Sequence, residues 1–148
     1  MELFSFFDTE NKEKWIFEIE KQDWGAAEFL SELLKENRFK ETLGEGGLYI
    51  MHDGEKIVSF ATLTQKDAID DETLSPWVGF LFVAPEYRGK RVSERLIAKL
   101  CGIARGQGYK KIYICTDHIG LYEKFGFTYM ENRIDVWGED SRIYYKDI

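Results

Sequence analysis

The chain has 148 residues and a formal net charge of −7, with 44% hydrophobic and 32% charged residues, which fits one globular domain over residues 1–148. The acidic balance disfavours nucleic acid as the main partner, no apolar run reaches the roughly 20 residues that cross a bilayer, and the first residues lack the features of a secretory signal; we therefore expect a cytoplasmic protein. Cys101 and Cys115 lie in apolar stretches without metal-ligand spacing, so we expect buried free thiols, no disulfide and no metal site.

The first half of the chain predicts helices followed by a hairpin. Phe4–Phe7 is a short apolar run that predicts a first strand. Lys12–Lys40 has apolar residues at close to helical spacing, and Gly25 is expected to divide it into two helices. The Asp53-Gly54 pair is a hairpin signal between two predicted strands, Gly47–Met51 and Lys56–Leu63.

The second half predicts a strand, a helix and further strands. A polar loop, Asp67–Ser75, precedes Trp77–Ala84, whose continuous apolar sequence is typical of a strand buried on both faces. From Arg88 to Ala104 apolar residues recur at spacings of three and four, which indicates a helix. The remaining predicted elements are a strand at Lys111–Cys115, a short helix at Gly120–Phe125, and closing strands at Phe127–Trp137 and Arg142–Ile148. This order predicts a mixed α/β (α+β) fold with one parallel crossover in its middle.

Charge is unevenly distributed along the chain. Residues 1–76 hold 8 Lys and Arg against 18 Asp and Glu, a net −10, whereas residues 77–148 hold 12 against 9, a net +3. This distribution suits a protein that binds an anion on one side and a cation on the other. The alternative is that the acidic side chains of the first half only form a solvated surface, which explains the same charge distribution.

The turn that opens the helix after Arg88 has the features of a phosphate site. A turn leading into a helix points several free backbone N–H groups one way, and the helix dipole adds partial positive charge there. Arg88, Lys90 and Arg91 add side-chain charge, and Gly89 lets the backbone approach a ligand closely. A diphosphate fits such a site, and so does the plainer interpretation of a solvated basic turn.

Two segments of the second half resemble a known family. Residues 77–100 (WVGFLFVAPEYRGKRVSERLIAKL) and residues 121–127 (LYEKFGF) are similar to the GNAT superfamily of N-acetyltransferases. In that family a strand leads into R/Q-x-x-G-x-G/A and a helix, and a second signature reads roughly L-Y-x-K-x-G-F. The resemblance implies a central, mostly antiparallel sheet with one parallel, splayed strand pair, flanked by helices. It also implies acetyl-CoA as cosubstrate, no metal, and direct attack by an amine.

The resemblance implies a set of acetyl-CoA-binding residues. Pantetheine is expected to pair with the backbone of the splayed strand, and the diphosphate with the turn and the first helical residues: Leu81, Phe82, Val83, Arg88, Gly89, Lys90, Arg91, Val92 and Ser93. Arg91 stands where the family has its first motif glycine, and Ser93 where it has Gly or Ala. Donation by backbone N–H groups survives both changes, but the approach of phosphate to a bare glycine does not.

Tyr122 is the candidate general acid. In LYEKFGF it occupies the position where the family commonly keeps a tyrosine, and a well-placed phenol can protonate the leaving thiolate. The alternative is a core aromatic residue with a hydrogen-bonded hydroxyl. Five further side chains are candidates for attracting a cationic amine or relaying its proton, unless they are simply solvated: Asp70, Asp71, Glu72, Asp117 and His118.

The sequence therefore predicts an acetyl-CoA-dependent N-acetyltransferase acting on a primary amine. The acidic first half favours a cationic small molecule as acceptor. Three alternatives remain open: a non-catalytic acyl-CoA-binding regulatory module on the same fold, an acetyltransferase for protein or peptide N-termini, and a plain interaction domain. The resemblance also leaves a homodimer open, although no segment of the sequence identifies an interface.

Overall fold

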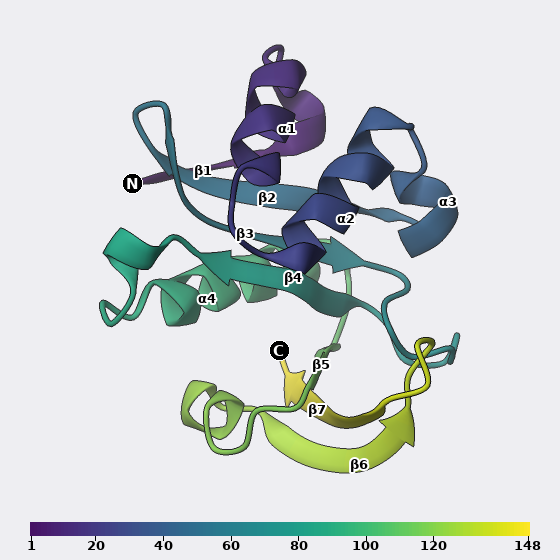
Figure 1. Cartoon of the computed structure of the whole chain (residues 1–148). Helices are drawn as coiled ribbons and strands as arrows, with labels where there is room; N and C mark the ends of the chain where they lie inside the picture. The colour runs from purple at the N-terminus through teal and green to yellow at the C-terminus, as the bar shows by residue number, and fades with distance from the viewer.

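One seven-stranded sheet in the order β1-β2-β3-β4-β5-β7-β6 runs through the computed structural model, which describes residues 1–148 (Figure 1). Every neighbouring pair is antiparallel except β4 and β5, which are parallel, so the mixed α/β architecture is confirmed. The strands are β1 (Glu2–Ser5), β2 (Gly46–Asp53), β3 (Lys56–Thr64), β4 (Trp77–Val83), β5 (Lys111–Thr116), β6 (Thr128–Ile134) and β7 (Asp140–Asp147).

Helices cover both faces of the sheet and create two apolar cores. Figure 1 shows α1 (Lys12–Glu20), α2 (Gly25–Lys35) and α3 (Phe39–Leu43) on one face and α4 (Val92–Gly106) on the other. The first core joins α1 and α2 to Phe60 and Phe82 of the sheet. The second is built on the buried stripe of α4, which includes Leu96, Leu100 and Ala104. Short 3-10 helices, η1 (Phe6–Asp8), η2 (Pro85–Tyr87) and η3 (Tyr122–Phe125), complete the chain.

The boundaries of several predicted elements were wrong. The strand predicted at Phe4–Phe7 ends at Ser5, because the chain turns into η1 and buries Phe6 in the core of the helical face. The segment Lys12–Lys40 forms parts of three helices rather than two, since Asn37 adopts a left-handed conformation (φ 56°) that ends α2.

Several predicted boundaries in the second half of the chain were also wrong. The helix predicted from Arg88 begins only at Val92, because Arg91 is also left-handed (φ 60°). The short helix predicted at Gly120–Phe125 begins at Tyr122, and the strand predicted from Phe127 to Trp137 ends at Ile134, where a turn to β7 begins. The loop Asp67–Ser75 is not simply polar, because Ile69 and Leu74 pack in a small core with Trp77.

A bulge in β4 opens a gap between β4 and β5. Phe60 pairs with Phe82 and Thr62 pairs with Gly79, so β4 has one extra residue between these pairs, and Phe80 takes a positive φ of 49°. On its other side β4 pairs with β5 only at Trp77 and Val78. Since a bulge increases local twist, the two parallel strands separate beyond that point, which confirms the splayed pair that the family resemblance implied.

Beyond the bulge, the backbone of Val83 faces the gap. The Ala84 N–H donates to the Val58 carbonyl (2.9 Å). In an antiparallel ladder the hydrogen-bonding residues alternate, so Val83 turns its N–H and carbonyl away from β3. Its carbonyl accepts a hydrogen bond from Arg88 Nε (2.9 Å), which leaves the Val83 N–H available in the gap. No helix of the chain combines the length and the apolar character needed to cross a membrane.

Candidate functional site

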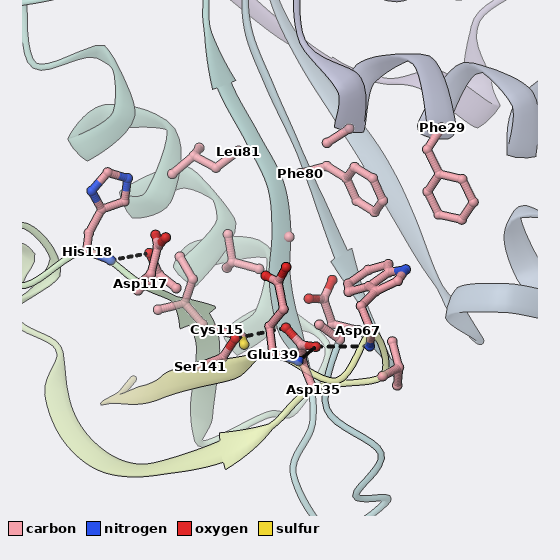
Figure 2. Close-up of a pocket in the computed structure, with 18 of the residues that line it drawn as sticks. Phe29, Asp67, Phe80, Leu81, Cys115, Asp117, His118, Asp135, Glu139 and Ser141 are labelled. Carbon is pink, nitrogen blue, oxygen red and sulfur yellow. Dashed lines mark hydrogen bonds between the residues drawn. The ribbon is translucent and has the colours of Figure 1, made fainter.

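A cavity of about 820 Å³ lies where β4 and β5 separate (Figure 2). It is lined by the start of α2, by Val78 to Leu81 of β4, by the end of β5 and the loop after it, by Tyr122 of η3, and by the turn between β6 and β7. Among the residues predicted from sequence, Leu81, Asp117, His118 and Tyr122 line this cavity.

The wall of the cavity is acidic and aromatic. It includes five carboxylic side chains and neither Lys nor Arg, leaving His118 as its only side chain that can become a cation: Asp67, Asp117, Asp135, Glu139 and Asp140. Four of these acids come from the second half of the chain, although the first half carries the larger negative charge. Aromatic rings from Trp24, Phe29, Phe80 and Trp137 share the wall. Carboxylates and aromatic faces both attract cations, so the cavity suits a positively charged ligand.

Asp67 lies at the start of the loop between β3 and β4, half-buried against the bulged strand (Figure 2). Burial raises the pKa of its carboxyl group to about 6, and the N–H of Ala68 offsets only part of this effect. A side chain at Gly79 would place its Cβ 2.2 Å from Asp67 Oδ1 and 2.9 Å from Thr62 Oγ1. The strand therefore needs glycine at position 79 so that the carboxylate can occupy this place.

Asp135 organises the turn between β6 and β7. Its carboxylate accepts hydrogen bonds from the N–H groups of Trp137 (2.9 Å) and Glu139 (3.0 Å) and from the Ser141 hydroxyl (2.9 Å). Burial opposes ionisation, but these hydrogen bonds hold the pKa of Asp135 below its ordinary value. The next residue, Val136, donates its N–H to the carbonyl of Ala68 (2.8 Å), which joins this turn to the loop that carries Asp67.

Tyr122 faces the cavity from η3 and is 6% exposed. Its ring packs against the rings of Phe125, Phe127 and Tyr144, and the ring of His118 lies 6.5 Å away. Burial, helped by the negative charge of Asp117, raises the pKa of Tyr122 to about 12. At neutral pH the phenol therefore keeps its proton and can only donate it.

The basic turn, residues 88–91, follows η2 at the far end of the gap. Gly89 and Arg91 are both left-handed (φ 77° and 60°), and no side chain caps the start of α4. The N–H groups of the first helical residues, beginning with Val92 and Ser93, have no partner within the helix and carry the positive end of its dipole. The side chains of Lys90 and Arg91 are exposed beside them, so the turn can accept an anion.

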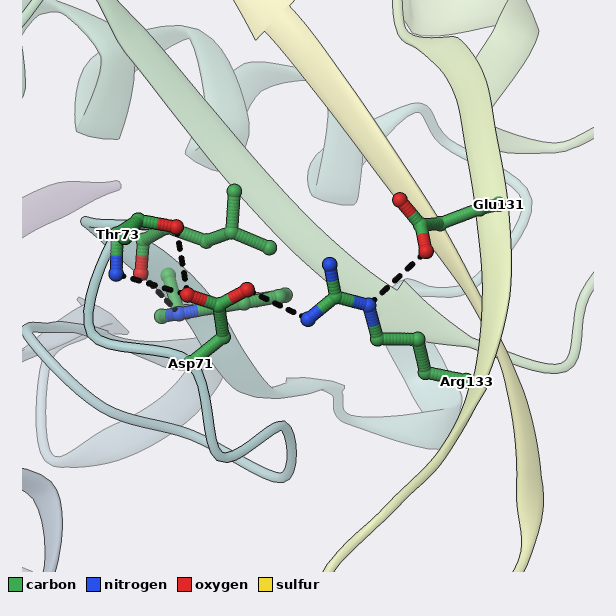
Figure 3. Close-up of polar contacts among 6 residues, drawn as sticks. Asp71, Thr73, Glu131 and Arg133 are labelled. Carbon is green, nitrogen blue, oxygen red and sulfur yellow. Dashed lines mark hydrogen bonds and ion pairs between the residues drawn. The ribbon is translucent and has the colours of Figure 1, made fainter.

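The acidic loop residues predicted near the acceptor lie away from the cavity wall. Asp70 and Glu72 are exposed, and Asp71 binds the Thr73 N–H (2.9 Å) and the guanidinium of Arg133 on β6 (Figure 3). Hydrogen bonds from Thr73 and Arg133 lower the pKa of Asp71 to about 2. Asp71 therefore fixes the loop to β6.

Cys115 lies on the cavity wall. Both cysteines are free, as predicted, although Cys115 is only half-buried. Burial is the main cause that raises the pKa of its thiol to about 11, with smaller contributions from the charges of Asp67, Asp135 and Asp117, so the thiol is not ionised near neutral pH. No group of His, Cys, Asp and Glu side chains is arranged to hold a metal ion.

Asp67, Gly79, Asp135 and Glu139 were not predicted as site residues from the sequence. One signal was present, because Gly79 is the one glycine within the apolar run of β4, and glycine inside a strand often marks close approach by another group. The carboxylates carried no such signal, since they come from segments far apart in the chain.

Comparison with known proteins identifies relatives of this arrangement. Residues 11–127 match the family model described as Acetyltransferase (GNAT) family. No curated protein sequence matches the chain. Among solved structures, an acetyltransferase from Streptococcus agalactiae 2603 is 22% identical with a TM-score of 0.69, covering 99% of this chain and 98% of its own.

Two further structures share the fold. A GNAT family acetyltransferase from Elizabethkingia anophelis with acetyl-CoA bound is 15% identical, with a TM-score of 0.66 over 99% of this chain and 97% of its own. An aminoglycoside 6'-acetyltransferase type Ii is 18% identical, with a TM-score of 0.71 over 99% and 97% of the two chains. At these identities the likeness is one of fold.

Proposed function

This chain belongs to the GNAT acetyltransferase family, and from that premise we propose that it transfers the acetyl group of acetyl-CoA to a primary amine of a cationic small molecule. The observation that carries the proposal is the cavity beside the β4–β5 gap, whose wall contains five carboxylic side chains and no Lys or Arg.

The proposal that acetyl-CoA binds is supported by the gap between β4 and β5 and by the basic turn. Pantetheine can add to β4 as a short strand in the gap, where the Val83 N–H has no partner strand. The diphosphate then reaches the start of α4, where backbone N–H groups meet the side chains of Lys90 and Arg91. The Elizabethkingia anophelis protein, which shares this fold, has acetyl-CoA bound.

The chemistry follows from this placement. The thioester carbonyl lies near the bulge, where backbone N–H groups of β4 can stabilise the negative charge that develops on its oxygen. The amine forms a C–N bond with the carbonyl carbon while the C–S bond breaks. Tyr122, which keeps its phenol proton at neutral pH, donates that proton to the departing sulfur. Holding donor and acceptor together supplies a further large part of the rate.

The proposal of a cationic acceptor is supported by the charges of the cavity wall. A molecule with several ammonium groups matches a wall that combines carboxylates with aromatic rings. The aminoglycoside 6'-acetyltransferase with the same fold has an acceptor of this chemical kind in its name. The wall lacks the cations that would favour an acidic acceptor.

Two measurements test the proposed function. Thermal melting should show stabilisation by acetyl-CoA at concentrations well above micromolar, because a ligand that binds only the folded state raises the melting temperature. Release of free thiol should then be measured with a panel of amines: kanamycin, spermidine, free amino acids and peptides with a free N-terminus. We expect transfer to kanamycin or spermidine and little transfer to the zwitterionic amino acids.

Each other outcome contradicts a stated part of the proposal. Stabilisation without transfer to any amine would indicate an acyl-CoA-binding regulatory module. Preferential transfer to peptides would replace the small-molecule acceptor by a protein N-terminus. Absence of stabilisation would contradict the acetyl-CoA site itself.

A further inference from the structure

Asp67 is a half-buried carboxylate without a cationic partner in the chain. Only its burial and the N–H of Ala68 shift the pKa of its carboxyl group, so no charged residue of the chain compensates it. Side chains of this kind are rarely buried unless something pairs with them. The carboxylate lies on the cavity wall, which is open to a ligand.

Thr62 of β3 provides a second, independent observation at the same place. It is 0% exposed, and its hydroxyl is the only fully enclosed side-chain polar atom of the protein without a hydrogen-bond partner. The hydroxyl lies 2.9 Å, and Asp67 Oδ1 2.2 Å, from the position that a Cβ of Gly79 would occupy. Both groups therefore border the space beside Gly79, and we expect a side-chain rotation of Asp67 to bring its carboxylate within hydrogen-bond distance of the hydroxyl.

This pair lies next to the bulge. Thr62 is the cross-strand partner of Gly79, and Phe80, with its positive φ, follows at once. The bulge is also where the proposed function positions the thioester carbonyl. An unpaired carboxylate at this point, beside a hydroxyl that has no other partner, is placed to meet the nucleophile of the reaction.

We propose that Asp67 is the catalytic base of this acetyltransferase, binding the acceptor's ammonium group and taking a proton from it, and that Thr62 positions Asp67. This inference rests on the proposed function, because it requires an amine acceptor and acetyl-CoA.

The proton balance of the step is complete. The acceptor enters as R–NH₃⁺, and Asp67 takes one proton, which frees the lone pair of the nitrogen. The C–N bond forms, the C–S bond breaks, and the sulfur receives the proton of Tyr122. The nitrogen loses a second proton, which restores Tyr122, and Asp67 releases its own proton to solvent through the open cavity. The net products are the amide, CoA thiol and one proton.

The groups that face Asp67 favour this role. The other acids of the wall, Asp117, Asp135, Glu139 and Asp140, would attract cationic acceptors, while His118, Cys115 and Tyr122 are the remaining titratable groups on the wall. Since the pKa of Asp67 is about 6, its carboxylate is ionised at neutral pH but remains close to the pH at which a base works best. Protonation of Asp67 should therefore reduce kcat/KM as the pH falls through about 6.

The decisive variant is Asp67→Asn, which keeps the shape and removes the charge. We expect kcat at neutral pH to fall by about 100-fold or more, and the acidic limb of the pH profile to disappear. Acetyl-CoA should stabilise the variant as it stabilises the wild type. Asp23→Asn, the same change at an exposed position on the loop before α2, is the matched control and should retain activity.

Asp67→Asn should increase the stability of the fold while it lowers the activity. In the folded state the pKa of Asp67 is about 6 against an ordinary 3.8, so ionisation destabilises the fold progressively between these pH values and fully above them. At neutral pH Asp67→Asn should therefore melt a few degrees above the wild type, and the difference should vanish below about pH 4. A carboxylate with only a structural role would not give a protein that is both more stable and inactive.

Thr62→Val tests the positioning role. Removal of an unpartnered buried hydroxyl should leave the melting temperature unchanged or higher. We expect Asp67, once it has rotated to meet the acceptor, to lack this donor to its charged form in the variant. The acidic limb of the profile should then move to higher pH, with about a 3- to 10-fold loss of kcat/KM at neutral pH. An unchanged profile would overturn the role of Thr62.

The outcomes separate the two proposals. If the wild type acetylates an amine and Asp67→Asn retains both its rate and its acidic limb, Asp67 is not the base, while the proposed function stands. If the wild type binds acetyl-CoA but acetylates no amine, the proposed function fails and the role of Asp67 fails with it.

Discussion

The basic turn before α4 and the acidic cavity beside β4 are built in opposite ways. The turn is continuous in sequence, its charges are exposed, and its backbone N–H groups point the same way because a helix begins there. The cavity is assembled from loops far apart in the chain, and its key carboxylate, Asp67, is half-buried. Under the proposed function, donor recognition would therefore be a local property of this chain, whereas acceptor recognition would depend on the complete fold.

The largest expected effect comes from Tyr122, which faces the cavity and would serve the chemistry of the donor. Tyr122→Phe should lower kcat by about 100-fold or more, since the leaving thiolate loses its proton donor. Binding of acetyl-CoA, measured by thermal shift, should not change. Tyr145→Phe on β7, which lies outside the cavity wall, is the control. Equal rates for the two variants would remove Tyr122 from the mechanism.

A methyl group on β4 should affect the acidic cavity alone. In Gly79→Ala the new Cβ would meet Asp67 Oδ1 at 2.2 Å, and the carboxylate can move away because it ends a flexible side chain. We expect kcat/KM to fall by about 10-fold through misplacement of Asp67, with unchanged stabilisation by acetyl-CoA. Steady-state kinetics and thermal shift measure the two effects. Loss of acetyl-CoA binding instead would show that the two regions are not independent.

Arg91 offers the corresponding test of the basic turn. Arg91→Gly should relieve a left-handed backbone and stabilise the fold by about 1 kcal/mol. It also removes a cation from the proposed diphosphate site, so the Kd for acetyl-CoA should rise by about 5-fold. Chemical denaturation and titration calorimetry measure these effects. Ala98→Gly, at an exposed position in the middle of α4, should instead destabilise the fold by about 1 kcal/mol.

The smallest effect is expected at the ion pair that supports the acidic loop. Arg133→Gln removes the partner of Asp71 and should lower the melting temperature slightly at neutral pH. The folded-state pKa of Asp71 is about 2 against an ordinary 3.8, so its contribution is present above the ordinary value and is lost as the pH falls towards 2. Melting curves of variant and wild type should therefore converge in acid, whereas a constant difference would assign the effect to packing.

Much of the fold could be predicted from the sequence because its signals are local. Apolar runs and turn signals identified most strands, and the spacing from Val92 to Ala104 identified α4. The boundaries that failed depend on residues whose backbone is set by tertiary structure. Asn37 and Arg91 are both left-handed. Asparagine adopts this region more readily than most residues, but no local preference predicts it for Arg91.

The residues of the candidate site fall into the same two groups, those in local motifs and those that only the tertiary structure brings together. Tyr122 and the basic turn belong to continuous motifs, so their positions could be predicted, although their roles remain proposals. Asp67 could not be distinguished from Asp70, Asp71 and Glu72 without the fold, because the packing of the loop through Ile69 and Leu74 is a tertiary feature. The carboxylates of the turn between β6 and β7 reach the cavity only through sheet pairing that spans the molecule.

The hydrogen bond from Val136 to Ala68 and the ion pair between Arg133 and Asp71 have a consequence for engineering. They fasten the β3–β4 loop and the β6–β7 hairpin to each other, and neither touches residues 88–93. Under the proposed function, the two segments would therefore form one module for amine choice that can be transplanted as a unit. If both segments were grafted together onto a related scaffold, they would keep the hydrogen bond and the ion pair that join them. A segment grafted alone would lose both contacts.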